Sequence, residues 1–338
     1  MRYFIFLYLT TLIHYTEASD KVLPLYQEDG LLEIDLYFSF ESLTNDVGKE
    51  PSYHDAWITL KEQEGPDSLK IKIKARGSFR KNPDNCDFPP LFIQKDDDKW
   101  SESLFAGDKK LKFVSHCRTA DEEFDQFVVQ EYLVYKAYSM FSLYHFKVRL
   151  AKITYHNTDN DSLIYERTGF FIEDKDDMAY RNNCRVIEVE NLSARQVNQK
   201  EFKKLSFFQY MIMNNDWAVS LLHNIIMVIE SPSLVPVAVP YDFDWAGIIN
   251  APYDMPTAKN APYLPERNYK GVCYKGKELK PVIQTFNDRR SDIYNLYYNC
   301  NYLTEENKQR IISTLDEFYV IINTRKYLRK NIIKACKF

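Results

Sequence analysis

The period of the hydrophobic pattern changes along the chain, and this change limits the folds that the sequence can adopt. Between residues 31 and 117 apolar and polar side chains alternate with period two, which predicts strands that bury one face. The clearest of these strands are 32–38, 69–76, 91–93 and 111–114. From residue 121 to residue 141 the apolar side chains recur at helical spacing instead, and acidic residues occupy the first turn. We therefore predict a β-rich first half that leads into one long helix, 121–141.

The second half of the chain reads mainly as helix. Strands return at 148–155 and 167–172, and from about residue 175 the helical period dominates. The segments that follow are a helix at 202–217, a hairpin of strands 224–229 and 234–241, a long loop at 250–275, a helix at 279–298 and a last helix capped by Thr304. This order predicts an α+β protein of two lobes, with a β-rich N-lobe at 19–174 and a helical C-lobe at 175–338 that contains the hairpin region 216–244.

The first 18 residues have the pattern of a signal peptide. Arg2 supplies a positive start, an apolar run covers residues 3–13, and the small residues Thr16 and Ala18 precede Ser19. The run is shorter than the ~20 residues that a membrane-spanning helix requires, although an uncleaved anchor is the alternative. We expect an exported protein of the periplasm, cell envelope or extracellular space, without a stable membrane span after cleavage. The 6 cysteines allow 15 pairings, so bridges and free thiols both remain open.

Composition and missing motifs exclude several classes of function. The chain has only 9 glycines, too few for the usual glycine-rich phosphate loops. Its net charge of −4 argues against nucleic acid as a partner. No C-x-x-C pair or H-E-x-x-H motif occurs, which disfavours a zinc site, and no G-x-S-x-G occurs, so the common serine-hydrolase elbow is missing.

The hairpin region 216–244 carries the strongest chemical pattern. A hairpin brings the start of its first strand to the end of its second, so Asn224 can lie close to Asp242. Asp242 and Asp244 are two residues apart and share one face of an extended strand. Such oxygen ligands suit Mg²⁺ or Mn²⁺ held partly by substrate phosphates, and Asp216 can orient an attacking hydroxyl. The structural alternative is that the two aspartates cap a turn and Asn224 satisfies the hairpin.

Cationic side chains in the first half form a second pattern. Lys70, Lys72, Lys74 and Arg76 share a strand face, which a solvated surface explains as well as a phosphate cleft does, and Arg76 at the strand end before Gly77 is the most specific of them. Lys112 on a strand precedes Glu131 in the long helix. A strand lysine paired to a helix glutamate is one way to hold nucleotide phosphates. Lys110 is the rival for this role.

Several motifs, taken in order, resemble one known family. They are KARGS at 74–78, PLFIQK at 90–95, EYLVYKAYSM at 131–140, YERTGFFIEDKDD at 165–177, FFQYMIMNNDWAVSLLHNIIMVI at 207–229 and PVAVPYDFDWAGIINAPYD at 236–254. In this arrangement the chain resembles the CotH kinase-like family, the bacterial relatives of spore-coat protein H, and most of all its exported members. The resemblance covers residues 67–300.

The resemblance implies an atypical protein-kinase-like fold of two lobes with ATP and Mg²⁺ or Mn²⁺ between them. It implies that Asp216 is the catalytic carboxylate, that Asn224 and Asp242, with Asp244 beside them, hold metal, and that Glu173 lies near the nucleotide base. One spacing departs from ordinary kinases: Asp216 and Asn224 are eight residues apart instead of five.

The predicted function is accordingly an exported phosphotransferase that acts on a protein or small-molecule hydroxyl. Lys112, Glu131 and Arg76 would contribute to binding the nucleotide. The alternative is a non-catalytic, pseudokinase-type binding or scaffold protein of the cell envelope.

Overall fold

The computed structural model describes residues 22–61, 68–96, 100–101, 103–107, 110–160, 162–252 and 266–336. The predicted signal peptide at 1–18 lies outside these residues, and so does half of the predicted loop at 250–275.

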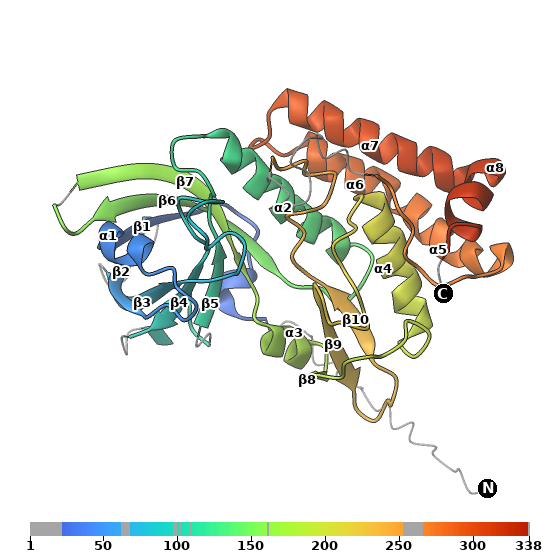
Figure 1. The fold of residues 1–338 in the computed structure, drawn as a ribbon, viewed down its shortest axis with the longest axis horizontal. Helices are drawn as coiled ribbons and strands as arrows, with labels where there is room; N and C mark the ends of the chain where they lie inside the picture. The colour runs from blue at the N-terminus through green and yellow to red at the C-terminus, as the bar shows by residue number, and fades with distance from the viewer. Residues whose placement is uncertain are drawn as a thin grey trace, which may run out of the picture.

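Seven strands of the described chain close into a β-barrel (Figure 1). They are β1 (Leu32–Phe38), β2 (His54–Leu60), β3 (Leu69–Ala75), β4 (Leu91–Lys95), β5 (Lys110–Val114), β6 (Val148–Asn157) and β7 (Ser162–Ile172). Their order around the barrel is β1-β2-β3-β4-β5-β7-β6. Neighbouring strands pair antiparallel, except that β1 and β6 pair in parallel. The parallel pair closes the barrel, with Leu32 opposite Ala151 and Phe38 opposite Asn157.

The predicted two-lobed, atypical protein-kinase-like fold is therefore wrong. The strands form a closed mixed barrel instead of the open sheet of an N-lobe, and the second half of the chain is not a purely helical lobe. The alternating pattern identified most strands because each buries one face, as the strictly alternating burial of β3 illustrates. The same pattern carries no information about which strand edges meet, and β2 was not predicted at all.

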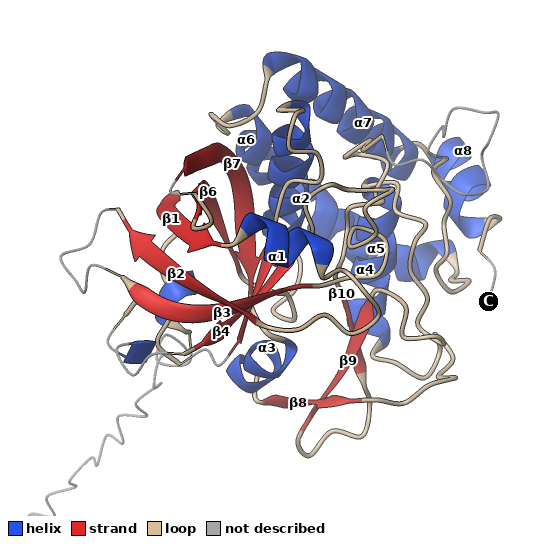
Figure 2. Cartoon of the chain, turned by 60° about the vertical axis from the view of Figure 1, so that its left-hand side comes forward, coloured by secondary structure: helices blue, strands red, loops and turns tan. Residues whose placement is uncertain are grey.

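Helices lie mostly on one side of the barrel, and one short helix lies apart from the others, against β3 (Figures 1 and 2). They are α1 (Phe40–Asn45), α2 (Glu123–Ser139), α3 (Lys175–Arg181), α4 (Gln199–Met211), α5 (Gly276–Asp288), α6 (Arg290–Tyr298), α7 (Glu305–Asn323) and α8 (Arg325–Leu328), with short turns of helix at Pro24–Tyr26 and Arg329–Ile333. The long helix predicted at 121–141 is α2. Thr304 caps α7 as expected, because its side chain accepts the backbone N–H of Asn307.

A second sheet lies below the helices and next to the barrel mouth (Figure 2). Its order is β10-β9-β8, and its strands are β8 (Cys184–Ile187), β9 (Ile225–Glu230) and β10 (Val237–Pro240). The β9–β10 hairpin matches the predicted one, whereas β8 falls in a region expected to be helical. The helix expected at 202–217 ends at Met211, and Met213 takes a left-handed backbone conformation with φ of 58°. The chain between α4 and β9 is thereby free to form a loop.

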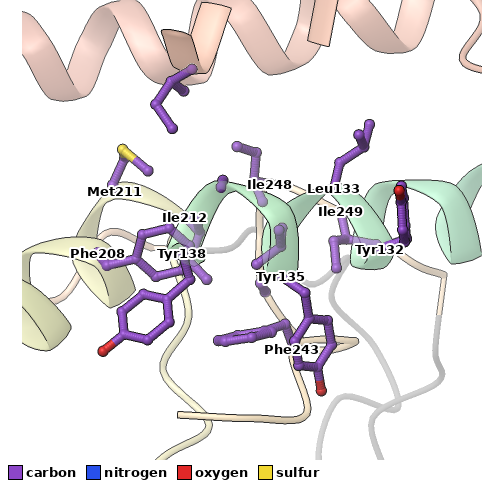
Figure 3. Packing of buried hydrophobic residues seen from close by; sticks show 14 of the residues in the cluster. Tyr132, Leu133, Tyr135, Tyr138, Phe208, Met211, Ile212, Phe243, Ile248 and Ile249 are labelled. Carbon is purple, nitrogen blue, oxygen red and sulfur yellow. The ribbon is translucent and has the colours of Figure 1, made fainter. Parts of the chain in front are cut away.

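Two large apolar cores hold the structure together. One fills the barrel interior. The other surrounds α2 and joins it to α4, α5, α6 and α7 (Figure 3). Strand β7 serves both cores, because adjacent strand residues point to opposite faces: Phe171 enters the barrel core and Phe170 packs toward Tyr132 and Tyr135 of α2. The many aromatic residues of the sequence are mostly core mass.

Two disulfides join distant segments, Cys86 to Cys117 and Cys273 to Cys336. Cys184 and Cys300 are free thiols. The first bridge ties the loop that follows β3 to the segment that follows β5, so it restrains the residues between Arg76 and Phe88. In the described part of the chain, no helix combines the length and the apolar character that crossing a membrane would require.

A buried histidine makes the stability of the fold depend on pH. His116 is 0% exposed, its ring stacks on Phe88 at 4.7 Å, and neither ring nitrogen has a hydrogen-bond partner among the described residues. Burial, together with the charges of Arg167 and Arg80, lowers the pKa of His116 well below its ordinary value. The folded protein therefore holds this imidazole neutral at pH values where the unfolded chain binds a proton.

We expect the free energy of unfolding to decrease as the pH falls below about 6.5, the ordinary histidine pKa. A full proton of difference gives a slope of about 1.4 kcal/mol per pH unit. In His116→Phe, which keeps the stacked ring, this slope should become shallower between pH 6.5 and 5. Urea unfolding across that range measures it. Equal slopes in the two proteins would show that His116 is not responsible.

Candidate functional site

A cavity of about 1170 Å³ opens where the barrel, α2 and the β9–β10 hairpin meet. Its wall comes from the end of β3 and the loop after it, from β5, from α2, and from the loops at the base of the hairpin. All eight residues predicted for the site line this one cavity: Arg76, Lys112, Glu131, Glu173, Asp216, Asn224, Asp242 and Asp244. Residues that are far apart in the sequence therefore come together, although several of their pairings differ from those expected.

The loop between α4 and β9 holds Asp216 through hydrogen bonds to both carboxylate oxygens. His223 Nε2 lies 2.7 Å from Asp216 Oδ1, and the Asn224 side-chain amide donates to Asp216 Oδ2 at 2.9 Å. The same amide donates to the Asp216 carbonyl oxygen at 2.8 Å. Because both of these partners are acceptors, it is the Asn224 nitrogen that faces Asp216. The eight-residue spacing between Asp216 and Asn224 is thus accommodated by a loop that an Ala218–His223 bridge closes.

Asp242 and Asp244 lie just after β10, at the other end of the hairpin. The Tyr241 N–H donates to the Asn224 carbonyl at 3.2 Å, which aligns the two ends as predicted. Asp242 has a left-handed backbone with φ of 59°, and Asn224 has φ of 51°. The Asp242 side chain opens to the cavity, while Asp244 is only 8% exposed. The two carboxylates do not merely cap an exposed turn.

Three carboxyl groups and two guanidinium groups share the closed end of the cavity. Burial raises the pKa of Glu131 to about 7, and the charge of Asp242 adds to the shift. Burial also raises the pKa of Asp242 and, together with Asp242 and Glu131, raises that of Asp244 far more. Arg76 and Arg80 oppose the shifts of Glu131 and Asp242. Full ionisation of all three carboxyl groups would leave more negative charge than the two arginines balance.

The predicted pair of Lys112 and Glu131 is not formed. The Lys112 ammonium lies 3.0 Å from Asp174 Oδ2, just before α3. Glu131 faces Arg80 instead, at 4.0 Å, and accepts the backbone N–H of Phe243. Sequence spacing suggested a partner on α2, but the pairing of β5 with β7 brings the end of β7 beside Lys112. The rival Lys110 does not line the cavity, and its ammonium lies 3.4 Å from the centre of the Phe92 ring.

Glu173 lines the cavity, but its side chain is already engaged. It is 2% exposed, and its two oxygens accept from Arg181 Nε and Nη2, each at 2.9 Å. The backbone N–H of Lys147 also donates to Glu173, at 2.9 Å. Glu173 therefore connects the end of β7 to α3 and to the start of β6.

The cavity is also lined by apolar and aromatic side chains, which are Val114, Phe146, Ile172, Ile226 and Tyr241.

In the described residues, no group of three or more His, Cys, Asp or Glu side chains is arranged to hold a metal ion. The donor set at the hairpin consists instead of the carboxylates Asp242 and Asp244, with Asn224 beside them. Mg²⁺ characteristically binds one or two carboxylates and takes its remaining ligands from phosphates and water. The excess of carboxyl groups over arginines gives a physical reason for a cation here, so these residues fit a metal that arrives with a phosphate ligand.

Several residues that line the cavity were not predicted from the sequence. Tyr135 lies on α2 one turn after Glu131, and its hydroxyl accepts the Asp242 N–H at 2.8 Å. Lys270 donates to the Asn215 carbonyl at 3.0 Å and to that of Trp217, on either side of Asp216. The helical spacing from Glu131 could have indicated Tyr135. Nothing in the local sequence indicates Lys270, because its role depends on a contact across about fifty residues.

No family model matches the chain, and a search of curated proteins finds no match.

Proposed function

We propose that this protein is an exported phosphotransferase that binds ATP together with Mg²⁺ or Mn²⁺ and transfers the γ-phosphoryl group to a hydroxyl of a protein or small-molecule acceptor. One observation carries the proposal. A single large cavity combines apolar side chains, five lysine and arginine side chains, a pair of carboxylates after β10 and a separate hydrogen-bonded carboxylate. These are the parts that phosphoryl transfer requires, since catalysis depends almost entirely on positioning and on electrostatic stabilisation.

The cavity is lined by both apolar and charged side chains. The side chains of Phe146, Ile172 and Ile226 offer surface on which a nucleobase can pack. Arg76, Arg80 and Lys112 provide positive charge for the phosphates. This combination supports a nucleotide as the ligand.

The carboxylates on the hairpin side have two roles in this proposal. Asp242 and Asp244 hold the divalent ion, and Asn224 lies close enough to assist. When bound, the ion neutralises negative charge that develops on the transferred group. Asp216, oriented by His223 and Asn224, positions the acceptor hydroxyl for attack.

Three further features support an exported enzyme of this kind. The apolar N-terminal run is typical of a signal peptide. Two disulfides suit an oxidising compartment. The motifs that resemble those of the CotH family are in keeping with nucleotide chemistry, although the proposal depends on the site and not on the fold.

One observation favours a second candidate, a protein that binds nucleotide without transferring phosphate. Each carboxylate oxygen of Asp216 already has one hydrogen-bond partner, so fewer of its acceptor sites are open to a substrate hydroxyl. Labelled ATP separates the two candidates. Transfer of the γ-phosphate to an acceptor or to water supports the enzyme, whereas metal-dependent binding without any turnover supports the binding protein.

Asp242→Asn tests the metal site. Asparagine tolerates the left-handed backbone at this position and removes one charge. We expect metal-dependent ATP binding to weaken by about tenfold or more, because affinity for hard cations follows the charge of their ligands. The unliganded protein should be equally stable or slightly more stable, since repulsion from Asp244 and Glu131 is relieved. Titration calorimetry with Mg²⁺-ATP and Mn²⁺-ATP, with thermal unfolding alongside, measures both.

The matched control is Asp84→Asn, the same chemical change at an exposed residue that does not line the cavity. It should bind ATP as the wild type does. Indistinguishable affinities in all three proteins would remove Asp242 from the proposed site. If even the wild type shows no nucleotide-induced stabilisation, which should reach ~2.7 kcal/mol at a hundredfold excess over Kd, the proposed function is wrong.

Lys112→Met tests the phosphate contact, and Lys110→Met on the same strand is its control. A charge-assisted hydrogen bond to phosphate contributes about 1.5 kcal/mol, so Lys112→Met should lower ATP affinity about tenfold. Loss of the ion pair with Asp174 should lower the free energy of unfolding by only about 1 kcal/mol, because the pair is partly exposed. Competition binding with a fluorescent ATP analogue gives the affinities. An equal loss of ATP affinity in the two variants would mean that the positive charge of the strand, and not a contact from Lys112, attracts the nucleotide.

A further inference from the structure

Two side chains of α2 hold the backbone of the carboxylate segment. The Asp242 N–H donates to the Tyr135 hydroxyl oxygen at 2.8 Å, and the next N–H along the chain, that of Phe243, interacts with the Glu131 carboxylate and opposes the rise of its pKa. Glu131 and Tyr135 are four residues apart, so they lie one above the other on the same face of the helix. Two successive amides are thus bound by two successive turns of one buried helix.

This attachment matters because of the conformation at Asp242. Its φ of 59° lies in the left-handed region, which residues with a side chain seldom adopt, although Asp and Asn do so more readily than most. The hydrogen bond that the Asp242 N–H donates to Tyr135 joins two residues that are 107 positions apart in the sequence. This partner therefore does not belong to a local turn.

Tyr135 is well placed to impose that conformation, because its own position is determined by packing. It is 3% exposed, its ring packs against Phe170 with centres 5.8 Å apart, and it meets Phe243 edge-on at 4.8 Å (Figure 3). The ring is therefore fixed on two sides, by the barrel strand and by the segment that its hydroxyl holds. Figure 3 shows Tyr135 and Phe243 side by side below α2.

We propose that Glu131 and Tyr135 act as a clamp on the backbone of residues 242 and 243, and that Tyr135 is a positioning residue which directs the Asp242 carboxylate into the cavity for cation binding. The proposal rests on the function proposed above and assigns to it a residue that binds neither nucleotide nor metal. It also gives Glu131 a role different from the support of a lysine. The carboxylate holds the metal-binding segment, and Arg80 at 4.0 Å balances its charge.

Tyr135→Phe removes the hydroxyl acceptor and retains the ring that packs against Phe170 and Phe243. Tyr132→Phe, the same change on the same helix at a residue outside the cavity wall, is the control. Two quantities are measured with a fluorescent ATP analogue: the Mn²⁺ concentration that gives half-maximal metal-dependent binding, and nucleotide affinity in EDTA. Loss of a residue that orients a metal ligand typically weakens metal affinity 10- to 100-fold.

We expect the half-saturating Mn²⁺ concentration to rise about tenfold or more in Tyr135→Phe and to stay within twofold in Tyr132→Phe. Metal-free nucleotide affinity should be unchanged in both. If Tyr135 contributed only to stability, Tyr135→Phe would lower the melting temperature without raising the half-saturating Mn²⁺ concentration relative to the metal-free nucleotide affinity. An unchanged Mn²⁺ requirement, or an equal loss of metal-free binding, would overturn the clamp.

Hydrogen exchange of the wild type provides a second measurement that does not depend on the variant folding. The amides of Asp242 and Phe243 should be protected to a degree similar to the amides of α2, and rapid exchange at both would overturn the clamp. Absence of any nucleotide binding by the wild type would instead overturn the proposed function, and with it the role of the clamp in that function. Wild-type binding together with an unaltered Tyr135→Phe would overturn the clamp alone.

Discussion

The packing of α2 between the barrel and the other helices is the constraint on which the site depends. Twelve of its residues are buried, including the polar Gln130 and Glu131. Its aromatic side chains meet Phe170 of the barrel on one side and Phe208 of α4 on another. A helix fixed in this way can hold other segments, and through Glu131 and Tyr135 it determines where the chain after β10 runs. The position of the carboxylates follows from hydrophobic packing.

Charge is the second constraint. Packing brings the carboxyl groups together, whereas their mutual repulsion opposes this arrangement. Burial beside α2 brings three carboxyl groups together and makes their joint ionisation costly, because each one disfavours the charge of the next. Arg76 and Arg80 reduce that cost without removing it. Both are held near the end of β3, where the disulfide between Cys86 and Cys117 restrains the loop. This balance of carboxyl and guanidinium groups is the basis on which we propose a cation and an anionic phosphate as ligands.

The fold shows where reasoning from pattern succeeds and where it fails. The alternation in β3 and the helical spacing in α2 predicted those elements because burial of one face follows directly from the order of residues. Closure of the barrel depends on the parallel meeting of β1 with β6, two strands separated by more than a hundred residues. Strand β8 is short and only partly buried, so it left no readable period. The expected two lobes were inferred from the order of the predicted strands and helices and from the order of motifs, neither of which specifies strand pairing.

The sequence by itself determined eight of the polar residues that line the cavity, although Tyr135 and Lys270 were not among them. It also determined the hairpin that brings Asn224 near Asp242, because a short turn between two apolar strands leaves few alternatives. Only the tertiary structure decided the partners: Asp174 and not Glu131 for Lys112, Arg181 for Glu173, and Tyr135 for the Asp242 backbone. The physical reason is the separation in sequence of the residues that come into contact. Periodicity and turns express contacts between neighbours in sequence, whereas these pairings form where separately folded segments are pressed together by a common core.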